Sequence, residues 1–290
     1  MPPDRSKIIV GAAAFGTNYG IKNSAAPDIA EVKEILSKAS EFKVWGLDTA
    51  RDYPESEKRI GLARPNELRI FSKFSHGTNF ADFNQLQAQV KDSLAKLEMQ
   101  NLEGMSPHSF RDFLQSGSTA VRNFCDLRES GLIRSWGLTF YEPKEFFAAL
   151  DIGRPDFIQV PLSFVDQRFA KSGILKKANE LRIEVHSRSI FLQGALLMRP
   201  EELPSNLSGL APSIFELRRR AERLGLSVES YLLSQALASE GISRVVVGVN
   251  AAQQLEQLMK SILDTTFPDD EGFVDSFLDD GLIDPRGWVN

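Results

Sequence analysis

The chain has 290 residues, of which 34 are lysine or arginine and 39 are aspartate or glutamate, so its formal charge at pH 7 is −5. Hydrophobic residues make up 42% and charged residues 25%, which is typical of globular proteins and excludes a disordered or fibrous chain. Acidic and basic residues are mixed and the isoelectric point is near 5.4, so a nucleic acid partner is not expected.

The single cysteine, Cys125, excludes an internal disulfide and any cysteine-based metal cluster. Near the start of the chain, charged residues precede an apolar run that is too short for a secretion signal. No stretch approaches the roughly 20 apolar residues that span a membrane. We therefore expect a soluble cytoplasmic protein without a membrane partner, and the sequence leaves its oligomeric state open.

Short apolar runs rich in β-branched residues recur along the chain, and each is followed by a segment with the period of an amphipathic helix. The expected strands lie near residues 8–15, 44–50, 68–74, 101–108, 133–139, 157–163, 183–191 and 244–249. The expected helices lie near residues 29–42, 55–63, 83–97, 118–130, 143–150, 169–182, 213–239 (two stretches) and 251–263. The sequence therefore predicts eight strand and helix units.

Apolar strands that alternate with amphipathic helices indicate a parallel sheet covered by helices. The length fits either two domains of about 150 residues or one barrel of about 250. A doubly wound open sheet would need a G-x-G-x-x-G turn after its first strand, and Gly11 to Gly20 lack that spacing. Without a linker of different composition, the eight units favour one (β/α)8 TIM barrel domain over residues 1–290.

Two segments fall outside this regular pattern. The connection at about residues 194–213 is long, and we expect it to be a mobile loop on the active face. The tail at about residues 265–290 is acidic with interspersed Phe, Leu and Trp. It either packs over the barrel or is disordered, and the sequence does not decide between the two.

Catalytic residues of a barrel project from the C-terminal ends of its strands. Asp48 ends the second expected strand with Tyr53 five residues later, Lys73 ends the third strand, and His108 ends the fourth. Because these strands are neighbours, the four side chains are expected to meet at one rim.

The chemical types of these four residues are complementary. A nearby ammonium favours loss of a phenolic proton, an aspartate keeps that ammonium charged, and a histidine nitrogen can hold a carbonyl oxygen. The set can polarise and protonate a carbonyl but has no hydride of its own, so it implies a reducing cofactor.

The segments that carry these residues resemble the aldo-keto reductase family. LDTARDYPESEKRIG matches the family pattern D-T-A-x-x-Y-x-x-S-E followed by leucine or isoleucine and glycine, and FSKF and MSPH supply the lysine and the histidine. Weaker matches are GLIRSWGLTFYEPKE, DFIQVPLSFVDQRF, RSIFLQGALL and VVVGVNAAQQLEQL, and together they cover about residues 8–260. The chain resembles short bacterial members, some of them found with sugar or surface-polysaccharide pathways.

The resemblance implies that Tyr53 is the general acid, that Lys73 and Asp48 tune it, and that His108 orients the carbonyl. It also implies NADPH, with NADH as the alternative, extended across the rim without a Rossmann domain. The residues it assigns to the cofactor are Gly11, Ala12, Thr139, Gln159, Arg188, Ser189, Phe191, Gln193, Gly248, Val249, Asn250, Gln254 and Gln257. The substrate pocket is expected to include Phe15 and Tyr141. We expect His76 and His186 to be structural, and we expect no metal site.

Several positions depart from the family pattern, and most lie in the expected cofactor site. Arg188 stands where many members have a tyrosine that stacks on nicotinamide, and Gln254 stands where an arginine often grips the 2′-phosphate. The other departures are Ala12, Thr139-Phe140 and Gln257-Leu258. Gly104 and Pro107 are also unfavourable within the fourth strand. We therefore expect the catalytic residues to be complete and the cofactor to bind more weakly than in typical members.

Three functions are consistent with these observations. The first is NADPH-dependent reduction of a small aldehyde or ketone, including a sugar-derived carbonyl. The second is a barrel that binds the cofactor with little or no turnover and acts as a sensor or subunit. The third, a non-redox isomerase or lyase, would need a metal cluster or a phosphate-binding glycine loop at the last strands, and the sequence offers neither.

Overall fold

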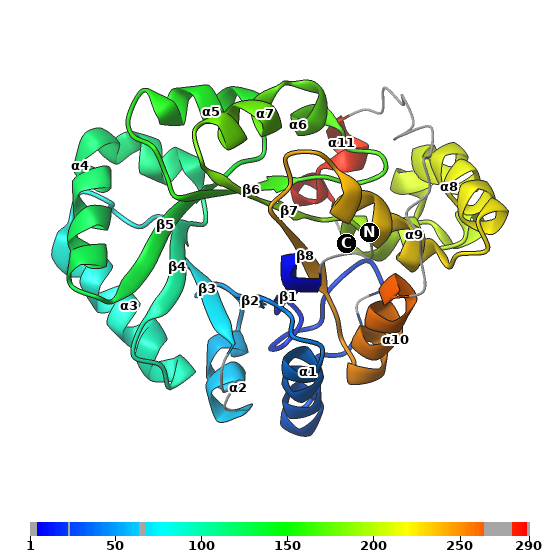
Figure 1. Cartoon of the computed structure of the whole chain (residues 1–290), viewed down its shortest axis with the longest axis horizontal. Coiled ribbons are helices and arrows are strands. Elements are labelled where there is room, and N and C mark those ends of the chain that lie inside the picture. Colours follow the sequence, from blue (N-terminus) through cyan, green and yellow to red (C-terminus); the bar gives the residue numbers. More distant parts are fainter. Residues whose placement is uncertain (1–4, 23, 64–67, 264–279, 289–290) are drawn as a thin grey trace.

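The computed structural model describes residues 5–22, 24–63, 68–263 and 280–288. Eight parallel strands pair in chain order, and the last pairs with the first to close a barrel (Figure 1). The strands are β1 (Ile8–Gly11), β2 (Gly46–Asp48), β3 (Arg69–Phe74), β4 (Leu102–Pro107), β5 (Ile133–Thr139), β6 (Phe157–Pro161), β7 (Glu184–Arg188) and β8 (Arg244–Gly248). The expected single-domain (β/α)8 barrel and its eight strands are confirmed.

The helices surround the ring of strands in Figure 1, except the last, which lies over one end of the barrel. They are α1 (Ile29–Glu41), α2 (Ser56–Ala63), α3 (Phe83–Leu97), α4 (Phe110–Glu129), α5 (Pro143–Leu150), α6 (Arg168–Lys171), α7 (Ile174–Glu180), α8 (Ala211–Arg223), α9 (Val228–Ala238), α10 (Ala252–Leu263) and α11 (Asp280–Ile283). Side-chain caps fix several starts: Asp28 accepts a hydrogen bond from the backbone of Glu31, and Asp82 from that of Gln85. Among the described residues, no helix has the length and apolar character needed to span a membrane.

Two helices differ from the sequence expectation, and a glycine accounts for each difference. α4 begins at Phe110 rather than near residue 118. It has helical segments on both sides of a kink at Gly117, where φ is 53°. The expected helix at 169–182 is divided into α6 and α7 by Gly173, where φ is 77°. Residues with a side chain rarely adopt such positive φ angles, so glycine permits the break at each position.

The connection after β7 is organised into short 3₁₀ segments rather than an irregular loop. They are η2 (Leu192–Leu197), η3 (Pro200–Glu202) and η4 (Ser205–Leu210). The segments are held in place because Leu192, Leu207 and Leu210 are buried in the core. Whether this connection moves on the active face stays a prediction.

The interior of the barrel is filled by aromatic side chains. Phe71 and Phe157 pack edge to face with ring centroids 5.2 Å apart, and the buried ring of His186 stacks on Phe157 at 5.0 Å. An added Cβ atom at Gly104 would lie 2.4 Å from Phe71, and one at Gly137 would lie 2.4 Å from Phe157. Gly104, which is unfavourable in a strand by propensity alone, is therefore needed to admit this aromatic layer.

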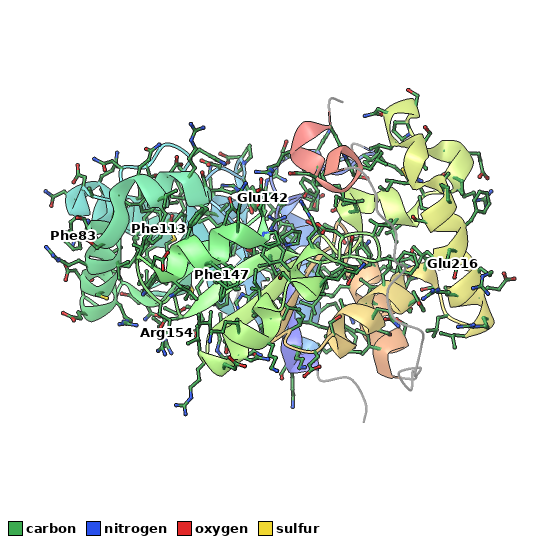
Figure 2. The ribbon with its side chains drawn as sticks, turned by 90° about the horizontal axis from the view of Figure 1, so that it is seen from above. Phe83, Phe113, Glu142, Phe147, Arg154 and Glu216 are labelled. Carbon is green, nitrogen blue, oxygen red and sulfur yellow. The ribbon has the colours of Figure 1, made fainter. Side chains whose placement is uncertain are left out.

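The described part of the tail lies on the C-terminal face of the barrel. In Figure 2, Glu142, which follows β5, lies in the upper half of the view, and Arg154, which precedes β6, lies in the lower half. The red helix α11 lies in the upper half as well. The side chain of Ile283 is buried there, and the Trp288 indole donates to the Gly281 carbonyl at 2.9 Å. Residues 280–288 thus pack over the barrel, whereas residues 265–279 of the expected tail lie outside the described residues.

Candidate active site

The motif that follows β2 is anchored to its neighbours by buried hydroxyl groups. The Thr49 and Ser56 hydroxyls lie 2.9 Å apart, and Ser56 also donates to the Ala12 carbonyl just after β1. Glu57 accepts a 2.6 Å hydrogen bond from the Ser72 hydroxyl on β3. The threonine, serine and glutamate of the motif are therefore structural, and they hold the loop that carries Tyr53 against two strands.

Asp48, Lys73 and Gln159 form a buried network between β2, β3 and β6. The Lys73 ammonium donates to both oxygens of the Asp48 carboxylate and, at 3.0 Å, to the Thr49 carbonyl. The amide of Gln159 donates to the same carboxylate oxygens at 3.1 and 3.2 Å. Lys73 and Asp48 are only 4% and 5% exposed, so each compensates a charge that would be costly to bury alone.

Tyr53 stands beside this ion pair, with the Lys73 Nζ atom 5.6 Å from the centroid of its ring. Burial of the phenol, together with the charge of Asp48, raises the pKa of Tyr53 well above its usual value, and Arg188 is the leading cation that opposes this rise. The phenol therefore keeps its proton at neutral pH. The expectation that Lys73 eases release of that proton stays a prediction, because the charge of Lys73 is shared with Asp48.

His108 follows β4 and faces Tyr53 edge on, with ring centroids 5.7 Å apart. Burial, followed by the positive charge of Lys73, lowers the pKa of His108 to about 4. The imidazole is therefore neutral at pH 7 and can donate a hydrogen bond through one nitrogen. Its Nδ1 atom is buried 3.3 Å from Asp52 Oδ2 but is not aligned for a hydrogen bond.

Asp52 and His76 join His108 in a group that the sequence analysis does not identify. Asp52 Oδ2 lies 2.6 Å from His76 Nδ1 and accepts a 2.8 Å hydrogen bond from the His76 backbone. One nitrogen or oxygen atom from each of the three side chains lies within 4.8 Å of the other two, which is a spacing that a metal ion could use. We interpret the group as hydrogen bonding at the rim, because the contact between Asp52 and His76 already has hydrogen-bond length. The residues follow β2, β3 and β4, so the reasoning that grouped the four catalytic candidates could also have grouped these.

The four candidate catalytic residues line a single cavity of about 550 Å³ at the C-terminal ends of the strands. Most of the other predicted site residues also line it. These are Gly11, Ala12, Tyr141, Gln159, Arg188, Ser189, Phe191, Gln193, Gly248, Asn250 and Gln254. Four predicted residues are not part of this lining: Thr139, Val249 and Phe15 are buried, and Gln257 lies further along α10.

The cavity also has walls that the sequence analysis misses. Tyr19 and Lys22 come from the loop after β1, and Pro285 and Arg286 come from the tail. The isoleucine backbone at position 21 donates to the Gln193 carbonyl at 3.1 Å, which joins the loop after β1 to the segment after β7. Neither wall belongs to a strand end, so the position of these residues depends on how the loops pack.

Comparison with known proteins assigns this barrel to a family of oxidoreductases that act on carbonyl groups. The model of the aldo/keto reductase family matches residues 7–272, so the chain belongs to that family. Its structure is similar to a holo aldo-keto reductase of Bacillus halodurans, with a TM-score of 0.73 and 20% identity over 90% of this chain and 88% of the other. It is also similar to the glycerol dehydrogenase of Gluconobacter oxydans, with a TM-score of 0.72 and 18% identity over 93% and 89% of the two chains. No curated protein sequence matches.

Several features of the cavity fit the nicotinamide cofactors that this family uses. Gly194 and Gly248 border open space, because an added Cβ at either would meet no atom within 4 Å. At position 254 the glutamine oxygen accepts a 3.0 Å hydrogen bond from the Asn250 backbone, so part of this side chain is already engaged in the loop.

Proposed function

We propose that this protein is a cytoplasmic enzyme that reduces a small aldehyde or ketone with NADPH, taking the proton from Tyr53. The observation that carries the proposal is the convergence of Asp48, Tyr53, Lys73 and His108 on one cavity. A sugar-derived carbonyl is a suitable substrate class, and the name of the Gluconobacter relative, a glycerol dehydrogenase, points to the same polyol chemistry. Because the two chains are only 18% identical, this relative supports the proposal through its similar fold alone.

Tyr53 supplies the proton. Its raised pKa keeps the phenol protonated, so it can bind a carbonyl oxygen as a hydrogen-bond donor before any charge develops there. A nicotinamide cofactor held in this cavity would supply the hydride that the reduction needs. As negative charge develops on oxygen, the nearby Lys73 ammonium stabilises the phenolate that remains after proton transfer.

His108 and Asp48 position the reacting groups. The lowered pKa of His108 keeps its imidazole neutral, so it orients the carbonyl oxygen by hydrogen bonding and does not compete with Tyr53 as an acid. The Asp48 carboxylate fixes the Lys73 ammonium from one side, and the Gln159 amide fixes the carboxylate. Lys73, Asp48 and Gln159 therefore each have a defined hydrogen-bond partner in this network.

The proposal is tested by replacing the acid. We expect Tyr53→Phe to lower kcat by roughly 10²- to 10⁴-fold, the usual contribution of general acid catalysis, with little change in the Kd for NADPH. Lys73→Met should cause comparable damage. The measurement is loss of NADPH absorbance with a panel of aldehydes, together with a fluorescence titration of NADPH into each variant.

Unchanged turnover in Tyr53→Phe would assign the proton to another group. A wild-type protein that binds NADPH but consumes none with any aldehyde would instead support the non-catalytic alternative of a sensor or subunit.

A further inference from the structure

Arg188 brings a positive charge into the cavity without a compensating carboxylate. It ends β7, and its guanidinium donates to the Phe140 carbonyl at 3.2 Å and to the Ser189 hydroxyl at 3.3 Å. The guanidinium carbon lies 4.1 Å from the centroid of the Tyr141 ring. Arg188 forms no ion pair within the part of the chain that the structure describes.

The other cations that line the cavity each have an acidic partner. Lys73 is paired with Asp48, and Lys22 lies 3.3 Å from Glu202. The Arg286 guanidinium donates three hydrogen bonds to the Asp284 carboxylate, at 2.9, 3.0 and 2.5 Å. The lining also includes the acid Glu229 at the start of α9, but Glu229 and Arg188 are not within ion-pair distance of each other. Among the cations of this lining, Arg188 is therefore the one whose charge is not balanced by a nearby carboxylate.

The position of Arg188 is close to the reacting groups. Its charge is the main influence that opposes the raised pKa of Tyr53. A second guanidinium, that of Arg286, lies 3.6 Å from the same Tyr141 ring. Two cations against one ring repel each other, and a half-buried guanidinium without an anion is unfavourable. An anion bound between the ring and the catalytic groups would remove both costs.

We propose that the substrate of this enzyme carries an anionic group, a carboxylate or a phosphate, which binds to Arg188 beside Tyr141. The inference rests on the proposed function, and it narrows the substrate to an aldehyde or ketone with such a group near its carbonyl. Arg286 on the tail provides a second, weaker attraction, because its own charge is shared with Asp284. An arginine suits this role because its planar guanidinium binds carboxylate and phosphate oxygens in pairs.

A cofactor phosphate is the other anion that could meet this arginine. The direction of the side chain argues against it, because Arg188 extends from β7 across the end of β6 to the Phe140 carbonyl after β5. It therefore points away from the β8 loop, where Asn250 and Gln254 line the cavity and where we expect the adenosine phosphate. The test must nevertheless separate the two anions.

The first experiment compares matched substrates. We would measure kcat/KM with NADPH for 4-carboxybenzaldehyde against benzaldehyde, and for glyceraldehyde 3-phosphate against glyceraldehyde. The wild type should prefer the charged member of at least one pair, and the pair identifies the anion as carboxylate or phosphate. Arg188→Met should reduce that preference by about 10- to 100-fold, as expected for loss of a hydrogen bond between charged groups. Arg188→Lys should restore part of it. Lys91→Met, which removes an exposed cation on α3 away from the cavity, is the control and should leave the ratio unchanged.

The second experiment measures binding and does not depend on turnover. Calorimetry would give the Kd of 4-carboxybenzaldehyde, benzaldehyde and inorganic phosphate for the wild type and for Arg188→Met, each with saturating NADP⁺, which has no hydride to give. A separate titration would give the Kd for NADPH. We expect Arg188→Met to raise the Kd of the carboxylate or phosphate compound by at least 10-fold and to leave the Kd of the neutral compound nearly unchanged. The NADPH titration shows separately how far the side chain also contacts the cofactor.

The outcomes separate this inference from the proposed function. Anion binding that depends on Arg188 in a protein that turns over no aldehyde would support the anion site and contradict the reductase. Turnover without any preference for charged substrates, or equal loss for charged and neutral compounds in Arg188→Met, would overturn the anion site alone. A loss of NADPH affinity that accompanies an unchanged substrate ratio would assign Arg188 to the cofactor and overturn it as well.

Discussion

At the scale of single residues, the two rings that face each other in the site have opposite pKa shifts from the same main cause. Burial disfavours the charged form of any group, so it raises the pKa of the Tyr53 phenol and lowers the pKa of the His108 imidazole. Both side chains are therefore neutral across the physiological range. A neutral phenol and a neutral imidazole can both donate hydrogen bonds to one carbonyl oxygen, which neither a phenolate nor a deprotonated nitrogen could do.

The lowered pKa of His108 predicts a pH dependence of stability. An unfolded histidine takes up its proton near pH 6.5, whereas folded His108 does so only near pH 4. Between these values the unfolded chain binds the additional proton, so the free energy of unfolding falls as the pH drops from 6.5 to 4. This contribution reaches about 3 kcal/mol at most and is absent above pH 6.5. Urea unfolding at pH 7 and pH 4.5 measures this effect. Between these pH values the free energy of unfolding should fall more for the wild type than for His108→Asn, and an equal fall in both would contradict the prediction.

Gln254 predicts the cofactor preference of the enzyme. Its neutral side chain, already engaged with the Asn250 backbone, can offer a 2′-phosphate only a weak hydrogen bond. We therefore expect modest discrimination between NADPH and NADH. Gln254→Arg should tighten NADPH by about 1–3 kcal/mol and leave NADH nearly unchanged. Titrations of both nucleotides into both proteins measure this, and an equal change for the two nucleotides would mean that position 254 does not meet the 2′-phosphate.

At the scale of elements, the loop that carries Tyr53 is held by few but well-placed groups. Ser56 connects this loop to Thr49 and to the Ala12 carbonyl, and its hydroxyl is fully buried. Ser56→Ala would leave both partners without a buried donor or acceptor, so we expect a loss of about 1–3 kcal/mol in the free energy of unfolding. Ser208→Ala is a suitable control, because Ser208 makes a comparable hydrogen bond to the Ser205 carbonyl on an exposed segment. Equal losses in the two variants would show that burial of the Ser56 hydroxyl has no effect.

The strands and the four catalytic candidates were predictable from the sequence because both follow from local pattern. A buried parallel strand is a short apolar run, and its last residue lies at the rim of a closed barrel whatever the helices do. Residues that depend on tertiary packing were not predictable in this way. The buried leucines that organise η2 and η4 and the contact of His76 with Asp52 have no local signature. The break at Gly173 and the kink at Gly117 could be suspected from glycine alone, but their effect depends on the surrounding helices.

At the scale of the whole molecule, one segment from the first part of the chain and one from the last part line the same cavity. The loop after β1 supplies Tyr19 and Lys22, and the tail supplies Pro285 and Arg286 (Figure 2 shows α11 on that face). The four residues that we propose as catalytic belong to β2, β3 and β4 and the segments that follow them, on the barrel itself. This division places the chemistry on the scaffold and the substrate wall on segments that can vary without disturbing it.

The tail therefore predicts a separation between substrate binding and chemistry. Removal of residues 280–290 takes away Pro285 and Arg286 from the cavity and exposes Tyr141 on one side, but it leaves the network of Asp48, Lys73 and Gln159 intact. Since the buried side chain lost with α11 is mainly Ile283, the free energy of unfolding should fall by only about 2–3 kcal/mol. We expect the KM for the preferred aldehyde to rise by about 10-fold or more, because the substrate loses a wall and a charge. The kcat at saturation should change much less.

Arg286→Ala in the full chain separates the two causes: a rise in KM equal to that of the truncation would assign the effect to the guanidinium, and a smaller rise would assign the remainder to the wall. A truncated protein with an unchanged KM would mean that the tail does not contact the substrate.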